Sequence, residues 1–120
     1  MTLARQSLGR WGEEAASAFL QERGFQVVAR NLRTPLGEID LIVRQGRDLV
    51  FVEVKTRRTA RFGAPQDAVT VRKQRQIIRA AQWYLGSGRH GGLQPRFDVV
   101  AVLASAAGPR IEHIANAFTL

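Results

Sequence analysis

Glu53 and Lys55 stand two residues apart in FVEVK (51–55), a run whose other members are apolar or aromatic. Residues two apart in a strand share a face, so the glutamate and the lysine point the same way. Two further acids, Glu38 and Asp40, lie just upstream in GEIDLIV (37–43). Carboxylates gathered beside one lysine could hold a hard divalent cation and act on a phosphate or a water molecule.

A short polar link around Gln45 and Gly46 joins the two acid-bearing segments, which predicts a β-hairpin. With the turn centred on that link, Glu38 lies opposite Glu53, and Asp40 lies one diagonal step from Glu53. Like charges placed opposite each other are destabilising. Burying them costs several kcal/mol per ion, in order of magnitude, unless they are paired or bind a metal. Mg²⁺ or Mn²⁺ is the simplest stabiliser of such a cluster, with the lysine aimed at the same phosphate or water.

Alternation of side chains along a strand assigns the other positions of the first hairpin strand. One face is predicted to carry Glu38, Asp40 and Ile42. The opposite face is predicted to carry Ile39, Leu41 and Val43. The same pairing places Asp40 directly opposite Phe51.

Two alternatives remain open for this cluster. A three-residue link would shift the pairing by one residue and place the acids on opposite faces of the sheet. Glu53 and Lys55 could also form an ordinary ion pair on a solvated face, with the other two acids in a turn. Against the second alternative, the charged face also carries Ile42, Leu49 and Phe51. These apolar side chains indicate that the face is partly covered rather than open to water.

The N-terminal half of the chain predicts the elements that lead into the hairpin. Apolar residues recur at helical spacing over 7–23, and Gly24 follows as a C-terminal cap. The β-rich segment 25–31 predicts a first strand. The hairpin strands themselves are expected over 37–44 and 48–55.

The C-terminal half predicts a second helix and two strands. The basic segment 56–65 contains Gly and Pro and is interpreted as a mobile loop. A long helix is expected from about residue 66 or 70 to residue 85, where Gly86 stops it. The nearly continuous apolar run 97–104 is typical of a central strand covered on both faces, and 110–114 is expected to form a last edge strand.

These elements predict a single α/β domain over residues 1–120. Their order is αβββαβ with one further strand, and helices flanking a mixed sheet are the natural arrangement. Arg96 and Asp98, at the start of the central strand, are expected to have structural roles.

The charge balance favours a polyanionic partner. The chain has 120 residues, with 18 basic against 10 acidic side chains, and a formal net charge of +8. Nearly all of the bases are arginine, whose planar group suits phosphate geometry, so DNA or RNA is the expected partner. The predicted phosphate-contacting residues are Arg57, Arg58 and Arg61 after the lysine, and Arg72, Lys73 and Arg75 on the second helix.

Other classes of site and location are disfavoured. There is no cysteine, which excludes disulfides and thiolate zinc sites, and two histidines are too few for a histidine-based metal site. No apolar run approaches the roughly 20 residues of a membrane span, and the N-terminus lacks a signal-peptide core. A cytoplasmic protein that does not bind membranes is the expectation.

The segments GEID and FVEVK resemble the D-x(n)-(D/E)-x-K signature of the PD-(D/E)xK nuclease superfamily, which includes restriction endonucleases and Holliday-junction resolvases. The ordered set GRWGEEAASAFL, GEIDLIV, LVFVEVKTR, FG and RFDVVAV further resembles the YraN family of small bacterial proteins and covers nearly the whole chain. The resemblance implies a restriction-endonuclease-like αβββαβ core. A proline usual before the first acid is replaced here by Ile39.

The resemblance also implies roles for individual residues. Asp40 matches the first acid, Glu53 the second and Lys55 the lysine. A glutamate of the first helix joins the metal shell in resolvase-like members, and Glu13 stands at that place. The adjacent Glu14 is the alternative, because both lie off the centre of the apolar face.

The implied reaction is hydrolysis of phosphodiester bonds of DNA with Mg²⁺ or Mn²⁺, in one or two copies. The ligands would be Asp40, Glu53 and the backbone carbonyl of Val54, with Glu38 as a candidate for a second metal. A resolvase-like, structure-specific enzyme would need two sites and therefore a homodimer. The alternatives are a non-catalytic nucleic-acid-binding protein that keeps a nuclease fold, and a nuclease subunit active only with a partner.

Overall fold

The computed structural model describes residues 3–58, 69–88 and 90–119. Within this part of the chain, helices and strands alternate in the order αβββαββ, as the sequence predicts. Their bounds are α1 Leu3–Glu22, β1 Gln26–Thr34, β2 Gly37–Gln45, β3 Asp48–Arg57, α2 Val71–Gly86, β4 Gln94–Ser105 and β5 Gly108–Phe118.

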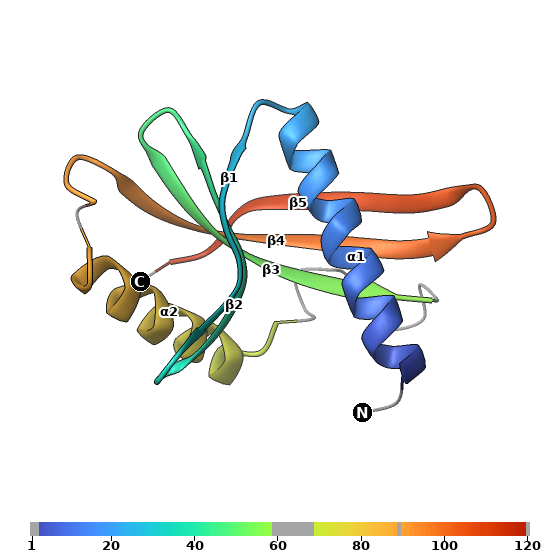
Figure 1. Ribbon diagram of the computed structural model, residues 1–120, viewed down its shortest axis with the longest axis horizontal. Coiled ribbons are helices and arrows are strands. Elements are labelled where there is room, and N and C mark those ends of the chain that lie inside the picture. The colour runs from blue at the N-terminus through green and yellow to red at the C-terminus, as the bar shows by residue number, and fades with distance from the viewer. Residues whose placement is uncertain (1–2, 59–68, 89, 120) are drawn as a thin grey trace.

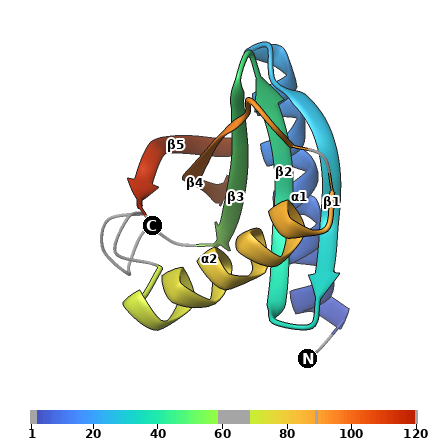
Figure 2. The same ribbon diagram turned by 90° about the vertical axis from the view of Figure 1, so that its left-hand side faces the viewer.

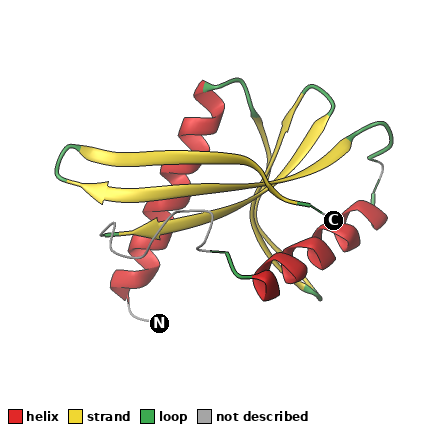
Figure 3. Ribbon diagram, turned by 180° about the vertical axis from the view of Figure 1, so that it is seen from behind, coloured by secondary structure: helices red, strands yellow, loops and turns green. Residues whose placement is uncertain are grey.

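The strands form one mixed sheet in the order β1-β2-β3-β4-β5. The first three are antiparallel neighbours, β3 and β4 are parallel, and β4 and β5 are antiparallel. The parallel pair requires a crossover, and α2 lies within it. The sheet is strongly twisted, and its strands fan out from a shared centre (Figure 3).

The two helices cover opposite faces of this sheet, with α1 behind it and α2 in front in Figure 2. The core on the α2 side includes Ile42, Phe51, Ile77 and Phe97. The core on the α1 side includes Ala16, Leu20, Val50 and Val100. Because β3 and β4 contribute to both cores, their apolar runs are buried on both faces, which confirms the predicted central strand.

Several predicted elements are longer in the structure. The first helix begins at Leu3 rather than at residue 7. The first strand continues to Thr34, because its pairing with β2 extends to Gly37. The last strand ends at Phe118 rather than at residue 114, and it pairs with β4 despite its weak apolar pattern. Pairing between strands therefore set the ends of β1 and β5 more than local composition did.

The helix ends follow the predicted capping chemistry. Gly24 has a φ of 89°, and Phe25 N–H donates to the carbonyl of Leu20 at 3.0 Å, which closes α1 as predicted. Thr70 caps the start of α2 by accepting from Lys73 N–H at 3.2 Å, which selects the later of the two predicted starts. The other start, residue 66, lies outside the described residues.

The register of the β2–β3 hairpin differs from the prediction by two residues. Gln45 pairs with Asp48, so the turn contains Gly46 and Arg47, with Gly46 at a φ of 60°. A glycine with positive φ at the first turn position favours such a two-residue turn. As a result Ile42, and not Asp40, pairs with Phe51. The contact between Asp40 and Glu53 survives this correction, because Asp40 accepts a hydrogen bond from Val54 N–H and is hydrogen-bonded with Glu53.

A buried ion network joins β3, β4 and β5 and confirms the structural role predicted for Arg96 and Asp98. Asp98 is fully buried and accepts hydrogen bonds from Arg96, from the backbone N–H of Asn116 and from the ring of His113, at 2.7–2.9 Å. Arg96 also contacts Asp48 at 3.1 Å. Burial raises the pKa of Asp98, but its hydrogen bonds from His113, Arg96 and Asn116 outweigh burial and lower that pKa.

Candidate active site

Strands β2 and β3 part at Asp40. Backbone pairing between them runs from Gln45 back to Leu41 and stops there, whereas β2 remains paired with β1 as far as Gly37. Beyond that point the Asp40 carboxylate accepts a hydrogen bond from Val54 N–H at 2.8 Å. The side chain of Asp40 thus replaces a backbone partner of β3, which fixes its carboxylate between the two strands.

The backbone of β1 is irregular directly beside Asp40. Asn31 lies between the pairs Arg30–Leu41 and Leu32–Ile39, and it has a φ of 50°. Such a left-handed residue interrupts the regular pleat of a strand. At the same level the alternation predicted for β2 is wrong: Ile39 packs on the α2 side with Ile42, whereas Leu41 packs on the α1 side.

Glu53 is buried beside Asp40, with 5% of its surface exposed. Burial, then a hydrogen bond with Asp40 and the charge of that carboxylate, raises the pKa of Glu53 to about 8, despite the opposing charges of Lys73 and Lys55. Glu53 therefore holds a proton in the free protein at neutral pH. Two carboxylates in contact form a site that needs a cation, either a proton or a metal.

Two lysines reach Glu53 from different elements. Lys55 Nζ, on the same strand, lies 4.0 Å from Glu53 Oε2. Lys73 Nζ, in the first turn of α2, lies 3.8 Å from the same oxygen. The sequence predicted Lys73 only as one of a row of phosphate contacts. The structure brings it into the acid cluster.

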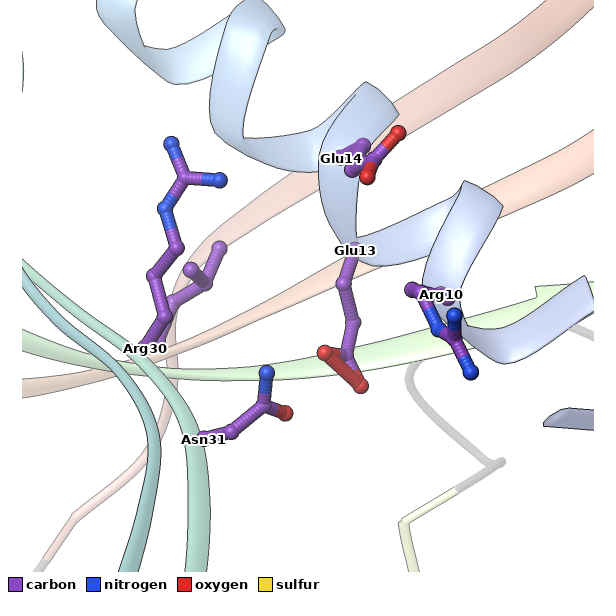
Figure 4. Close-up of a pocket in the computed structure, with 6 residues that line it drawn as sticks. Arg10, Glu13, Glu14, Arg30 and Asn31 are labelled. Atoms are coloured by element: carbon purple, nitrogen blue, oxygen red, sulfur yellow. The ribbon is translucent and has the colours of Figure 1, made fainter. Parts of the chain in front are cut away.

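Glu13 approaches the cluster from the α1 side of the sheet. It lines a pocket of about 90 Å³ together with Arg10, Glu14, Arg30, Asn31 and Leu41. In Figure 4, Glu13 points from α1 toward Asn31, while Glu14 points away. Burial and then the charge of Asp40 raise the pKa of Glu13, against a hydrogen bond from Asn31. Of the two adjacent glutamates, Glu13 is therefore the one directed toward Asp40.

Gly12 allows α1 to approach β3 at the level of this cluster. It is buried, and a Cβ atom built at this position would overlap the side chain of Thr56. By contrast, a Cβ at Gly9, one turn earlier, would meet nothing within 4 Å. The close contact at Gly12 sets the distance between α1 and the sheet, and hence the position of Glu13.

Glu38 does not lie opposite Glu53, so that predicted pairing is wrong. The shifted register and the parting of β2 from β3 move it away, and it pairs instead with β1. There it forms a solvent-exposed ion pair with Arg33, with Nε and Oε1 3.4 Å apart. In the described ranges 3–58, 69–88 and 90–119, no three Asp, Glu or His side chains lie close enough to enclose one ion.

The remaining predicted phosphate contacts that the structure describes lie at the end of β3 and on α2. Arg57 ends β3, and the exposed Arg58 follows it. Arg72 and Arg75 are exposed on α2, a helix without any acidic residue. Arg61 lies outside the described residues.

Sequence reasoning missed the part played by Asn31. Its side chain bonds Glu13, and its backbone adopts a positive φ within β1, between the residues that pair with Leu41 and Ile39. The available signal was its residue type, because asparagine is one of the few residues besides glycine that readily adopts positive φ. Arg10 and Arg30, which flank the pocket, carried no distinguishing signal in this basic sequence.

The fold defines the class of protein as an α/β domain with a mixed five-stranded sheet and an αβββαβ core. A sequence model described as "Uncharacterised protein family UPF0102" matches residues 12–102. The chain belongs to this family, which is the YraN family that its motifs resemble. The description assigns no activity to the family.

Relatives in several bacteria match nearly the full chain. A UPF0102 protein of Syntrophotalea carbinolica is 53% identical, over 98% of this chain and 96% of the relative. One of Desulfosudis oleivorans is 49% identical, over 95% and 91%. One of Moorella thermoacetica is 48% identical, over 85% of each. None of the described helices is long and apolar enough to cross a membrane.

Proposed function

We propose that the protein is a divalent-cation-dependent nuclease that hydrolyses phosphodiester bonds of DNA. The observation that carries the proposal is the buried contact between the carboxylates of Asp40 and Glu53, with Lys55 beside them. A structural role alone gives no reason to bury a glutamic acid against a second carboxyl group. A site that exchanges a proton for a metal does.

The donor set suits a hard cation. Asp40 and Glu53 would hold Mg²⁺ or Mn²⁺, and the backbone carbonyl of Val54 is a further oxygen ligand beside them. Mg²⁺ in proteins is commonly held by one or two carboxylates, with water and substrate phosphate in the remaining positions, so a third acid is not required. Glu13, directed toward Asp40, would act from the far side of the strands. Glu38, paired with Arg33, would contribute through longer-range charge only.

Each protein group has a definite task in this reaction. When bound, the cation neutralises the phosphate and activates water. Lys55 orients the attacking water and offsets the negative charge that develops on the phosphate. Val54 N–H holds the Asp40 carboxylate in place. The exposed Arg58, Arg72 and Arg75 would contact flanking phosphates, which positions the substrate without reading its sequence.

A second candidate function is nucleic-acid binding without catalysis on a nuclease fold. It is favoured by the ion contacts of Glu53 with two lysines, which balance this acid without a metal. A nuclease subunit that requires a partner would behave like this non-catalytic protein when alone, and would cut nucleic acid only when its partner is present. A resolvase-like activity would further require a homodimer.

The test is incubation of the purified protein with linear duplex, single-stranded, flapped and four-way-junction DNA, with Mn²⁺ or with a chelator. We expect cleavage of at least one substrate in Mn²⁺ and none in chelator. Which substrate is cut gives the shape preference. Binding to all of them without cleavage in Mn²⁺ would favour the non-catalytic function instead.

A further inference from the structure

The solvent-facing side of α2 carries a row of arginines that ends in a tryptophan. All of its members are exposed, and in chain order they are Arg72, Arg75, Arg79 and Trp83. Successive members stand three or four residues apart, which places them along one side of the helix. The helix has no acidic residue of its own to neutralise these charges. We call this row the outer face of α2.

Trp83 differs from the aromatic residue beside it. The ring of Tyr84 turns inward, edge-on to Phe51 with centroids 6.1 Å apart and stacked on His90 at 4.7 Å. Trp83 instead leaves 41% of its surface exposed. Among the described residues, no aromatic ring or arginine stacks on it. A single exposed apolar residue is ordinary, but here a flat aromatic surface lies open at the end of a row of positive charges.

The outer face leads away from the candidate active site. Lys73, in the first turn of α2, has its Nζ 3.8 Å from Glu53 Oε2, so the helix begins at the acid cluster. Trp83 follows near the other end of the helix, roughly 15 Å further along the axis at a rise of about 1.5 Å per residue. A stacked strand of nucleic acid rises about 3.4 Å per nucleotide, so this separation corresponds to about four nucleotides.

We propose that the outer face of α2 binds a single-stranded segment of the substrate, with its arginines on the phosphates and Trp83 stacked on an unpaired base. The choice of nucleic acid as ligand rests on the proposed function, whereas cleavage is not required for it. Base pairs inside a duplex are covered on both faces by their neighbours, so an indole can stack only on a base outside the stack. A basic track combined with aromatic stacking is how proteins hold single strands without reading sequence.

This inference narrows the substrate class. Substrates that offer unpaired nucleotides about four positions from the cleaved bond, such as flaps and single strands, would engage both the acid cluster and Trp83. A continuous duplex would contact the arginines alone. Single-stranded and flapped DNA are therefore expected to bind more tightly than a blunt duplex.

The first experiment measures binding in chelator, by the anisotropy of a fluorescein-labelled oligothymidylate and of a labelled blunt duplex of the same length. We expect Trp83→Ala to weaken binding to the single strand by roughly five- to a hundredfold, and binding to the duplex by less than about twofold. Trp83→Phe keeps a ring and should retain most of the single-strand affinity. Val28→Ala removes another exposed apolar side chain, on β1, and should leave both affinities unchanged.

The arginines are tested by the salt dependence of binding to the single strand. Loss of one phosphate contact should reduce the slope of log affinity against log salt by about 0.7 for a single strand. We expect this change for Arg79→Gln. Arg110→Gln, which removes the same charge from an exposed position on β5, is the matched control and should keep the wild-type slope.

Tryptophan fluorescence reports the stacking directly. The sequence has two tryptophans, and Trp11 packs against the core on the α1 side. Contact between an indole and a base quenches the indole emission, so unlabelled oligothymidylate should lower the emission of the wild type. The emission of Trp83→Phe, which retains Trp11, should stay unchanged. Thermal unfolding of each variant verifies that it is folded.

Equal losses of single-strand and duplex affinity in Trp83→Ala would overturn the stacking, as would wild-type emission that does not change on binding. Trp83-dependent binding to anionic lipid vesicles, without binding to the oligothymidylate, would overturn the proposal in favour of a membrane surface. These outcomes are separate from the test of nuclease activity. A protein that binds single strands through Trp83 but never cuts would contradict only the nuclease. A protein that cuts, with normal binding by Trp83→Ala, would contradict only the role of the outer face.

Discussion

The carboxylate of Asp40 accepts a hydrogen bond from Val54 N–H at 2.8 Å, at the point where β2 and β3 separate. This contact holds the carboxylate of one strand against the acid that precedes Val54 on the next. Burial, and then the hydrogen bond with Asp40 and the charge of that carboxylate, raise the pKa of Glu53 to about 8, so Glu53 keeps a proton at neutral pH. The central claim, that a divalent cation takes the place of this proton, depends on this contact.

The pKa of Glu53 predicts how stability changes with pH. Because the folded-state pKa is raised from 4.5 to about 8, the unfolded chain releases this proton at lower pH than the folded protein does. The raised pKa of Glu53 therefore costs the folded protein no stability below about pH 4, where the acid is protonated in both states. This loss of unfolding free energy grows as the pH rises to about 8. We expect the gain in unfolding free energy on Glu53→Gln to be larger at pH 9 than at pH 4 by several kcal/mol, in order of magnitude.

Urea denaturation of the two proteins across this pH range makes the measurement. Glu112→Gln, an exposed acid on β5, is the control and should leave the pH profile unchanged. A Glu53→Gln effect that is constant from pH 4 to pH 9 would show that Glu53 ionises normally.

Cation binding should stabilise the folded protein through Asp40. A ligand at about 100 times its dissociation constant adds roughly 2.7 kcal/mol, which corresponds to a rise of several degrees in melting temperature. We expect Mn²⁺ at pH 8 to raise the melting temperature of the wild type, and to have little effect on Asp40→Asn. Glu22→Gln, an exposed acid at the end of α1, should keep the full response. An equal response in Asp40→Asn would place the ion elsewhere.

Gly12 should be intolerant of any side chain. An added methyl group would overlap Thr56, so Gly12→Ala forces α1 away from β3. Overpacking of this kind typically costs about 1–3 kcal/mol. Gly9→Ala is the matched control in the same helix, where the methyl group meets open space and alanine should stabilise by up to about 1 kcal/mol. Chemical denaturation of both variants tests the difference, and a stable Gly12→Ala protein would contradict the close contact.

Asp98 should contribute stability that is lost in acid. Its pKa is lowered in the folded protein, so the contribution is present above about pH 4 and disappears as the pH falls through the folded-state pKa. Asp98→Asn removes the charge facing Arg96 and His113 in a buried network, a change that costs roughly 3–5 kcal/mol at pH 7. The difference from the wild type should shrink at low pH. Denaturation curves at pH 7 and below pH 4 decide this, and a difference independent of pH would contradict it.

The sequence predicted the order of elements because apolar periodicity and capping residues are local signals. Gly24 and Thr70 are examples, since each ends or begins a helix through contacts within a few residues. The approach of Asp40 to Glu53 was also predicted, because a hairpin places the acids of its two strands next to each other. The exact register was missed by two residues, since it depended on which pair of polar residues forms the turn.

The other features missed in the sequence depend on distant parts of the chain. The positive φ of Asn31 and the reversed face of Ile39 lie on neighbouring strands, β1 and β2, whose pairing brings them together. The place of Lys73 depends on how α2 crosses the sheet, which the 56–65 segment does not reveal. Gly12 looked like any helical glycine until α1 was packed against Thr56.

The most direct test of the central claim separates binding from cleavage at one site. Asp40→Asn and Lys55→Ala should each bind the preferred DNA substrate within about threefold of the wild type in chelator, because neither is a main phosphate contact. Their single-turnover cleavage in Mn²⁺ should fall at least about a hundredfold, as expected when a group acting in the transition state is removed. Cleavage by either variant at the wild-type rate would contradict the proposed active site.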